Sequence, residues 1–310
     1  MDTEGLGALD EDSNHDVRIF SLAILLSSFF LYNSVGSIDE NALSSLSLVI
    51  NLTRHIQLKA QGVSQEDIDP EEYSQYFPSF MWVVRDFALQ LVDLEGEPIT
   101  SKEYLEKALQ PQKGFSDGVE QKNRIRRMLK SFFKERDCCT MIRPLTKEEN
   151  LQCLEKIAIE ELRPEFVEQF MGLRRKVINR IKAKVMHGKK LSGDMLYNLA
   201  GSYVDAINRG AVPNIETAWS YICKSQCQRA QQESYEKFER SFQEAFEQRA
   251  PIFEEELAEI YKECKRNSLE EFSKTAVGDV AKSFLIELKD KMKHKFKLIK
   301  QENEKIAEVS

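Results

Sequence analysis

The run Ser79-Phe-Met-Trp-Val-Val-Arg-Asp86 decides how the first part of this 310-residue chain folds. Its apolar centre and charged end are typical of a β-strand that is buried on both faces. The run Ser27-Ser-Phe-Phe-Leu-Tyr32 has the same character, and residues 38–59, which lie between the two runs, repeat apolar side chains at the period of a helix. A strand, a helix and a second strand in this order favour parallel pairing with a right-handed connection. The first third of the chain is therefore predicted to be α/β.

The strands are predicted to end with a third run, Cys138–Ile142, because Arg143-Pro144 follows and proline cannot continue a central strand. From Thr146 onward the pattern is helical and is interrupted by proline and glycine. The breaks lie at Arg163-Pro164, His187–Gly193, Gly210–Pro213, Ala250-Pro251 and Thr275–Gly278. They favour helices that fold back on one another, so we predict an α/β domain over residues 1–147 and an all-α elongated helical domain over residues 148–310.

Composition limits the partners of the chain. It carries 44 Lys and Arg against 51 Asp and Glu, a net charge of −7, which argues against a nucleic-acid partner because phosphate backbones need a basic field. The six cysteines have neither zinc-ligand spacing nor a disulfide pattern, and the acidic segment Met1–Asp16 lacks the basic start of a signal peptide. Both features predict a cytoplasmic protein. The basic run Lys289–Lys300 has two interpretations, a peripheral contact with an acidic membrane and a solvated helix face.

The segment Asp2-Thr3-Glu4-Gly5 has the D-x-x-G pattern that follows a strand in nucleotide triphosphatases. In that setting the aspartate contacts Mg²⁺ through water and the glycine N–H can approach a γ-phosphate. The alternative interpretation is an acidic, flexible segment.

Asp86 is the other candidate, because it stands at the carboxyl end of a predicted buried strand, where open parallel sheets bind ligands. A carboxylate there can accept two parallel hydrogen bonds from the N1–H and N2–H edge of guanine, a pair that adenine does not offer. The alternative is a simple ion pair between Arg85 and Asp86.

Several of these motifs, in this order, resemble the guanylate-binding proteins, the interferon-inducible branch of the dynamin-like large GTPases. The matching segments are Asp2–Gly7, Ile19–Ser28, Tyr32–Gly36, Trp82–Phe87, Phe132-Phe133, Arg143-Pro144, Leu162–Phe166 and Tyr203–Ile207. The resemblance implies GTP and Mg²⁺ as ligands and a large GTPase domain ahead of the helical one. Members carry a T-x-R-D-like guanine motif, of which Val83-Val84-Arg85-Asp86 keeps the Arg-Asp and lacks the threonine.

The same resemblance assigns roles to individual residues. It implies that Asp2 and Gly5 lie near Mg²⁺ and the γ-phosphate, that Glu4 helps to position the attacking water, and that Arg85 and Asp86 belong to the nucleotide site. It also places residues 112–133 in a guanine cap that joins two GTPase domains as a homo- or heterodimer. Arg126 falls where the family has a cap arginine, and its alternative is a solvated arginine on a basic helix face.

The phosphate-binding loop G-x-x-x-x-G-K-[ST] does not occur in residues 1–310. We therefore expect an amino-terminally shortened member of the family, with a partial GTPase domain whose sheet lacks its first strands. An incomplete gene model is one origin of such a sequence. Such a chain should bind GTP poorly, hydrolyse it negligibly, and expose apolar strand edges at residues 27–32 and 79–84 that lower its solubility. One alternative is a non-enzymatic remnant that pairs with complete family members, and another is a helical scaffold with an incidental α/β cap.

Overall fold

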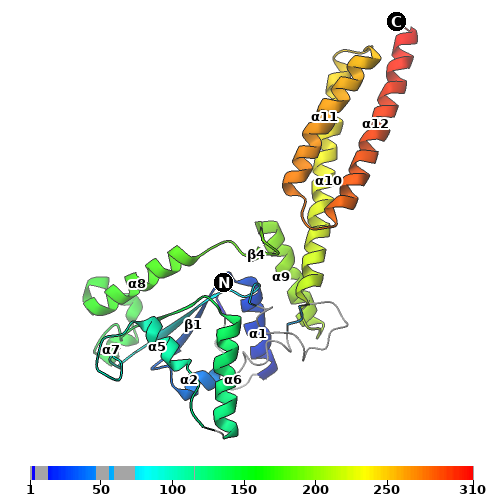
Figure 1. The fold of residues 1–310 in the computed structure, drawn as a ribbon. Helices are drawn as coiled ribbons and strands as arrows, with labels where there is room; N and C mark the ends of the chain where they lie inside the picture. The colour runs from blue at the N-terminus through cyan, green and yellow to red at the C-terminus, as the bar shows by residue number, and fades with distance from the viewer. Residues whose placement is uncertain (1, 4–12, 47–55, 59–73, 115, 310) are drawn as a thin grey trace. The chain divides into compact units, whose positions relative to one another are not determined.

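The computed structural model describes residues 2–3, 13–46, 56–58, 74–114 and 116–309, and the chain forms two compact units that divide between Ile215 and Glu216 (Figure 1). The first unit holds a parallel sheet and the second is helical. The predicted domain boundary after residue 147 lies just past the end of the sheet and does not coincide with the division between the two units. It stays a prediction.

The sheet of the first unit has three parallel strands in the order β1-β2-β3, with β1 at Phe29–Val35, β2 at Ser79–Arg85 and β3 at Arg136–Thr140. This confirms the predicted parallel α/β arrangement. Trp82, in the central strand, is fully buried and donates its indole N–H to Ser34 Oγ at 2.8 Å. The predicted exposed edge at residues 79–84 is wrong, because β3 pairs with β2 there. Among the described strands, β1 pairs only with β2, and the expected effect of its edge on solubility stays a prediction.

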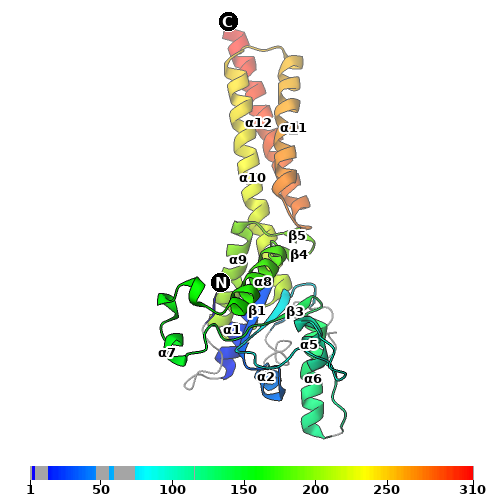
Figure 2. The ribbon, with the colours of Figure 1, turned by 90° about the vertical axis from the view of Figure 1, so that its left-hand side faces the viewer.

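Helices α1 (Ser13–Leu26), α2 (Glu40–Ser45), α5 (Ser101–Ala108) and α6 (Asp117–Phe132) accompany the sheet (Figure 2). The predicted helix starts are confirmed, since Asp39 caps α2 by accepting from Ala42 N at 2.8 Å and Thr100 forms a capping box with Glu103 at the start of α5.

The predicted helix over residues 38–59 ends early, because α2 stops at Ser45 and Gln57 lies in a β-bridge with Asn214. Ser44 and Ser45 donate their hydroxyls to the carbonyls of Glu40 and Asn41, a local bond that weakens a helix. Residues 47–55 and 59 lie outside the described residues.

After the sheet come short turns, α7 (Glu148–Leu151), two 3₁₀ segments (Leu154–Lys156 and Ile159–Glu161), α8 (Pro164–Arg180) and α9 (Gly193–Asn208). The prediction that strands stop at Ile142 is wrong, because β4 (Val185–Met186) and β5 (Lys189–Lys190) form a short antiparallel hairpin. His187 and Gly188 have φ of 46° and 73°, the positive values that a type I′ turn requires at both central residues.

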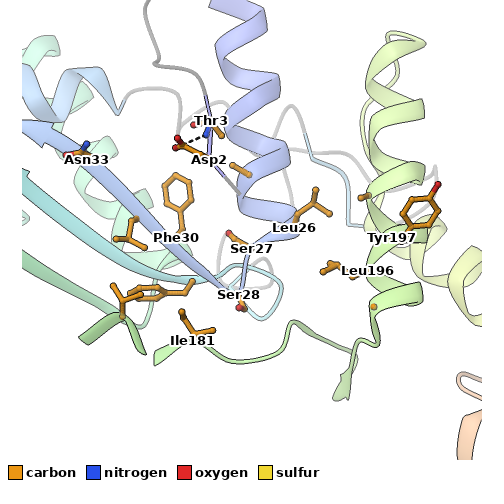
Figure 3. Close-up of a pocket in the computed structure, with 16 residues that line it drawn as sticks. Asp2, Thr3, Leu26, Ser27, Ser28, Phe30, Asn33, Ile181, Leu196 and Tyr197 are labelled. Carbon is orange, nitrogen blue, oxygen red and sulfur yellow. Dashed lines mark hydrogen bonds between the residues drawn. The ribbon is translucent and has the colours of Figure 1, made fainter. Parts of the chain in front are cut away.

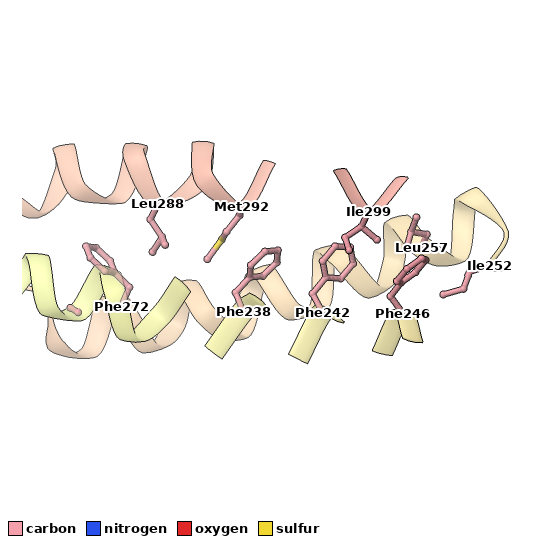
Figure 4. Close-up of a cluster of buried hydrophobic side chains, with 10 residues drawn as sticks. Phe238, Phe242, Phe246, Ile252, Leu257, Phe272, Leu288, Met292 and Ile299 are labelled. Carbon is pink, nitrogen blue, oxygen red and sulfur yellow. The ribbon is translucent and has the colours of Figure 1, made fainter. Parts of the chain in front are cut away.

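The second unit consists of three long helices, α10 (Ile215–Glu247), α11 (Glu254–Thr275) and α12 (Ala281–Val309), which run side by side in Figures 1 and 2. The predicted breaks at Ala250-Pro251 and Thr275–Gly278 fall in the turns between them, and the all-helical prediction is confirmed here. Their shared core contains Phe238, Phe242, Phe246, Leu257, Phe272, Leu288, Met292 and Ile299 (Figure 4).

The basic run Lys289–Lys300 lies on α12, and its apolar side faces this core. Ile299 is buried and Phe296 stacks on Tyr261 with ring centroids 4.4 Å apart, while Lys295 and Lys300 pair with Glu239 and Glu254. These contacts agree with a helix face that packs on the core, while Leu298 is 48% exposed and the membrane contact stays a prediction. Among the described helices, none combines the length and the apolar character that crossing a bilayer requires.

Candidate functional site

The carboxyl ends of the three strands meet at one edge of the sheet, and Asp86 follows the central one. Gly36 N donates to Arg85 O at 2.8 Å and Phe87 N donates to Met141 O at 2.9 Å, so the backbone ties the three strand ends together around residue 86. Asp86 itself has φ of 54°, in the left-handed region that aspartate tolerates better than most residues, and its side chain is 31% exposed. The fold thus holds this carboxylate at the strand end in a fixed and accessible position.

The electrostatic partner of Asp86 is Arg143, whose Nε lies 3.6 Å from Asp86 Oδ2. Arg85 does not take that role, because its Nε donates to Asn33 Oδ1 at 2.9 Å. Arg143 is half-exposed and also pairs with Glu148 at 3.0 Å, and a contact of 3.6 Å is beyond ordinary hydrogen-bond length. The Asp86 oxygens therefore keep the capacity to accept further hydrogen bonds.

Asp2 lies beside β1, not beside Asp86. It is exposed, accepts a hydrogen bond from Thr3 N at 3.1 Å, and lines a cavity of about 820 Å³ together with Asn33 and Phe30. Figure 3 shows Asp2 and Asn33 on the side of β1 and Tyr197 of α9 on the other side. Asp86 is not among the residues that line this cavity. Asp2 lies beside β1 and Asp86 follows the neighbouring strand β2, but the two carboxylates do not share a pocket.

Two of the predicted site residues, Glu4 and Gly5, lie outside the described residues. Asn33 lines the cavity with Asp2 and accepts a hydrogen bond from Arg85, the residue that precedes Asp86. The sequence analysis did not single it out, although Asn33 directly follows the predicted strand Ser27–Tyr32.

Arg126, in the predicted cap segment, is not a solvated arginine. It is 2% exposed, and it donates from Nε to Ala108 O at 3.0 Å and from its terminal nitrogens to Glu40 and Asn123. Asn123 in turn exchanges two hydrogen bonds of 2.9 Å with the backbone of Gln112. Arg126 therefore holds α6 against α2 and the end of α5 within its own chain.

All six cysteines are free thiols, of which Cys138, Cys139, Cys223 and Cys227 are buried and Cys153 and Cys264 are half-buried. Burial raises the pKa of Cys138 to about 12, so it is a protonated, unreactive thiol at neutral pH. No cluster of three or more His, Cys, Asp or Glu side chains suited to a metal ion is found in the described ranges.

Comparison with known proteins bears on this arrangement directly. Residues 1–186 match the family model for the N-terminal domain of guanylate-binding proteins, and residues 187–310 match the model for their C-terminal domain. The chain belongs to the guanylate-binding protein family. The resemblance inferred from the sequence motifs is thereby confirmed.

Similar guanylate-binding proteins span a range of mammals. The chain is 34% identical over 297 residues to guanylate-binding protein 1 of Chlorocebus aethiops, covering 95% of this chain and 50% of that protein. It is 34% identical over 298 residues to guanylate-binding protein 7 of Homo sapiens (95% and 46%) and 33% identical over 313 residues to guanylate-binding protein 4 of Mus musculus (99% and 49%). The chain thus spans about half the length of the curated guanylate-binding proteins that it matches.

Proposed function

We propose that this chain is a guanine-nucleotide-binding, dynamin-like protein in which Asp86 recognises the base. The supporting observation is the accessible carboxylate of Asp86 at the carboxyl end of the central strand, with Arg143 as its one long-range ionic contact among the described residues. A carboxylate in that place accepts the N1–H and N2–H of guanine, whereas adenine presents an acceptor and no such pair. Family membership supports guanine as the base.

Phosphate binding and hydrolysis form a second part of the proposal. Asp2 would contact Mg²⁺ through water, Gly5 the γ-phosphate, and Glu4 the attacking water. A triphosphate is normally gripped by the backbone N–H groups and lysine of a phosphate-binding loop, and residues 1–310 contain no such pattern. We therefore expect this polypeptide to bind GTP weakly and to turn it over negligibly. A cytoplasmic location belongs to the same proposal and is supported by the six free thiols.

Titration of the purified chain with fluorescent guanine and adenine nucleotides in the presence of Mg²⁺ tests base recognition. Asp86→Asn should weaken guanine binding about tenfold, because an amide in place of the carboxylate loses one charge-assisted acceptor, and should leave adenine binding unchanged. Asp205→Asn is the matched control, since Asp205 is exposed on α9. Equal guanine affinity of Asp86→Asn and the unaltered chain would remove Asp86 as the base reader, and submicromolar affinity of the unaltered chain would refute weak binding.

Pairing of two chains through the cap segment, residues 112–133, is the third part of the proposal. Because Arg126 bonds within its own chain, Arg126→Ala should lower the free energy of unfolding by about 1–2 kcal/mol. The loss stays moderate because Glu40 is partly exposed and can bond to water or to Lys122 instead. Arg127→Ala, which removes a side chain that is 53% exposed, should cost less than about 0.5 kcal/mol.

Urea unfolding and sedimentation velocity of the same two variants separate the structural role from the cap role. A purely structural Arg126 predicts a less stable Arg126→Ala that still pairs whenever the unaltered chain pairs in the presence of nucleotide. Loss of pairing in Arg126→Ala under conditions where that variant is folded would instead support the cap role that the family implies.

A further inference from the structure

The amino-terminal edge of the sheet carries a second cavity, at the opposite ends of the strands from Asp86. It has a volume of about 620 Å³ and is lined by Ser28 before β1, by residues 74–79 at the start of β2, by Lys134 and Glu135 before β3, and by residues that flank β4 and β5. A volume of this size lies within the range of small-molecule sites. Neither Asp2 nor Asp86 lines it.

Lys184 is the unusual residue of this cavity. It is only 8% exposed, and its Nζ donates to the carbonyl oxygens of Ser27 at 2.8 Å and of Tyr76 at 2.6 Å. An ammonium group has three donors, so one remains after these two bonds, and both acceptors are neutral. No carboxylate pairs with Lys184 in the described part of the chain, and burial is what lowers its pKa, to about 8. A buried cation without a counter-charge is costly to a fold, which calls for an explanation.

The other charges of the cavity are mostly of the same sign. Lys182 and Lys190 are exposed and line it with Lys134, and the one carboxylate, Glu135, accepts a hydrogen bond from Ser79 Oγ at 2.7 Å. A chain of net charge −7 thus gathers four lysines around one cavity. Several lysines that line one partly enclosed space raise its positive potential and attract anions. Part of the lining is apolar, because Phe77 and Pro78 also border the cavity.

We propose that this cavity binds a phosphate-bearing small molecule whose phosphate contacts Lys182, Lys184 and Lys190 and whose apolar part lies against Phe77 and Pro78. The phosphate supplies the negative charge that Lys184 lacks and accepts its third N–H. A phosphate fits this role because it offers several strong acceptor oxygens to converging donors. The site is separate from the proposed nucleotide site and does not depend on it.

Phenyl phosphate is a suitable probe because it combines the two halves of the proposed ligand. Calorimetric titration of the full chain at constant ionic strength should show saturable binding that is tighter than that of inorganic phosphate. Asp86→Asn should leave this binding unchanged, which separates the site from the nucleotide pocket. Absence of saturable binding of phenyl phosphate would overturn the proposal.

A pair of exposed lysines keeps the test independent of folding defects. Lys182→Ala combined with Lys190→Ala should weaken phenyl phosphate binding about tenfold, since each removes a charge-assisted contact. Lys293→Ala combined with Lys297→Ala, two exposed lysines of α12, removes the same charge and should leave the affinity unchanged. Equal weakening in both double variants would show unspecific attraction and would refute the site.

Chemical labelling reports on Lys184 itself. Because burial lowers the pKa of Lys184 to about 8, a larger share of its amine is neutral at pH 8 than in an exposed lysine, and mass spectrometry can follow its acetylation by trace acetic anhydride. Saturating phenyl phosphate should slow the acetylation of Lys184 about fivefold or more, because it shields the amine and stabilises its charged form. The acetylation of Lys297 should not slow. An unchanged Lys184 rate at saturation would place the probe elsewhere and contradict the proposal.

Discussion

Replacing Phe242 by alanine is expected to lower the free energy of unfolding of the helical unit by about 3–5 kcal/mol, the usual cost of truncating a buried phenylalanine. Phe242 is fully buried on α10, and its ring centroid lies 5.5 Å from that of Phe238, 5.9 Å from Tyr261 on α11 and 6.2 Å from Phe296 on α12. A single ring therefore contacts all three helices. Its removal leaves a cavity that no one helix can close by shifting alone.

Phe253→Ala is the matched control, because Phe253 at the start of α11 is 83% exposed. It should change the free energy of unfolding by less than about 0.5 kcal/mol. Far-UV circular dichroism during urea unfolding reports mainly on these long helices and measures both variants. Similar midpoints for the two variants would show that the ring cluster does not hold the three helices together.

Replacing Asp137 by alanine should destabilise the sheet unit by roughly 3 kcal/mol, near the lower end of the cost of breaking a buried ion pair. Asp137, in β3, is 3% exposed and accepts from Cys138 N at 2.8 Å, while Lys176 and Arg180 of α8 approach its Oδ2 at 3.1 and 2.7 Å. The two cations are about 40% exposed and can turn to water, so the cost stays below that of a fully buried triad. Asp290→Ala, at an exposed position of α12, is the control.

The same variant predicts a pH dependence. Burial pushes the pKa of Asp137 upward, but the hydrogen bond from Cys138 N and the ammonium of Lys176 outweigh it, so the pKa is lower than the ordinary value. The folded chain thus binds this proton less tightly than the unfolded chain. The stabilisation is complete above the unfolded pKa of about 3.9 and is lost as the pH falls through the lower folded pKa. Urea midpoints of the unaltered chain and Asp137→Ala should converge below about pH 4, and a constant difference there would contradict this origin.

The sheet and the helix starts were predictable because their signals are local. The apolar run at residues 79–86 and the Thr100–Glu103 pair each determine a short segment through its own side chains. The early end of α2 was missed because its two serines are a weak signal against a helical pattern. The β4–β5 hairpin lies at the predicted break His187–Gly193, but a break alone does not tell a turn between helices from a hairpin. The family itself followed from motif order and was confirmed.

The candidate site was predictable only in part. The place of Asp86 followed from the rule that ligands bind at the carboxyl ends of parallel strands. The sequence analysis took Arg143 only as the residue that ends a strand and did not predict its contact with Asp86. The burial of Arg126 was missed because its partner Glu40 lies 86 residues away in the sequence. Lys184 was missed for the same reason, since its two acceptors precede it by 157 and 108 residues. Such contacts depend on tertiary packing, which periodicity does not encode.

The parallel pairing of the strands has a consequence for how the chain acquires its structure. Side chains that bond across the sheet are far apart along the polypeptide, 48 residues for Ser34 with Trp82 and 56 residues for Ser79 with Glu135. Closing such large loops costs entropy before any strand contact forms, whereas the backbone hydrogen bonds of a helix join residues only four apart. The sheet of the first unit is therefore expected to form more slowly than the individual helices of the second unit.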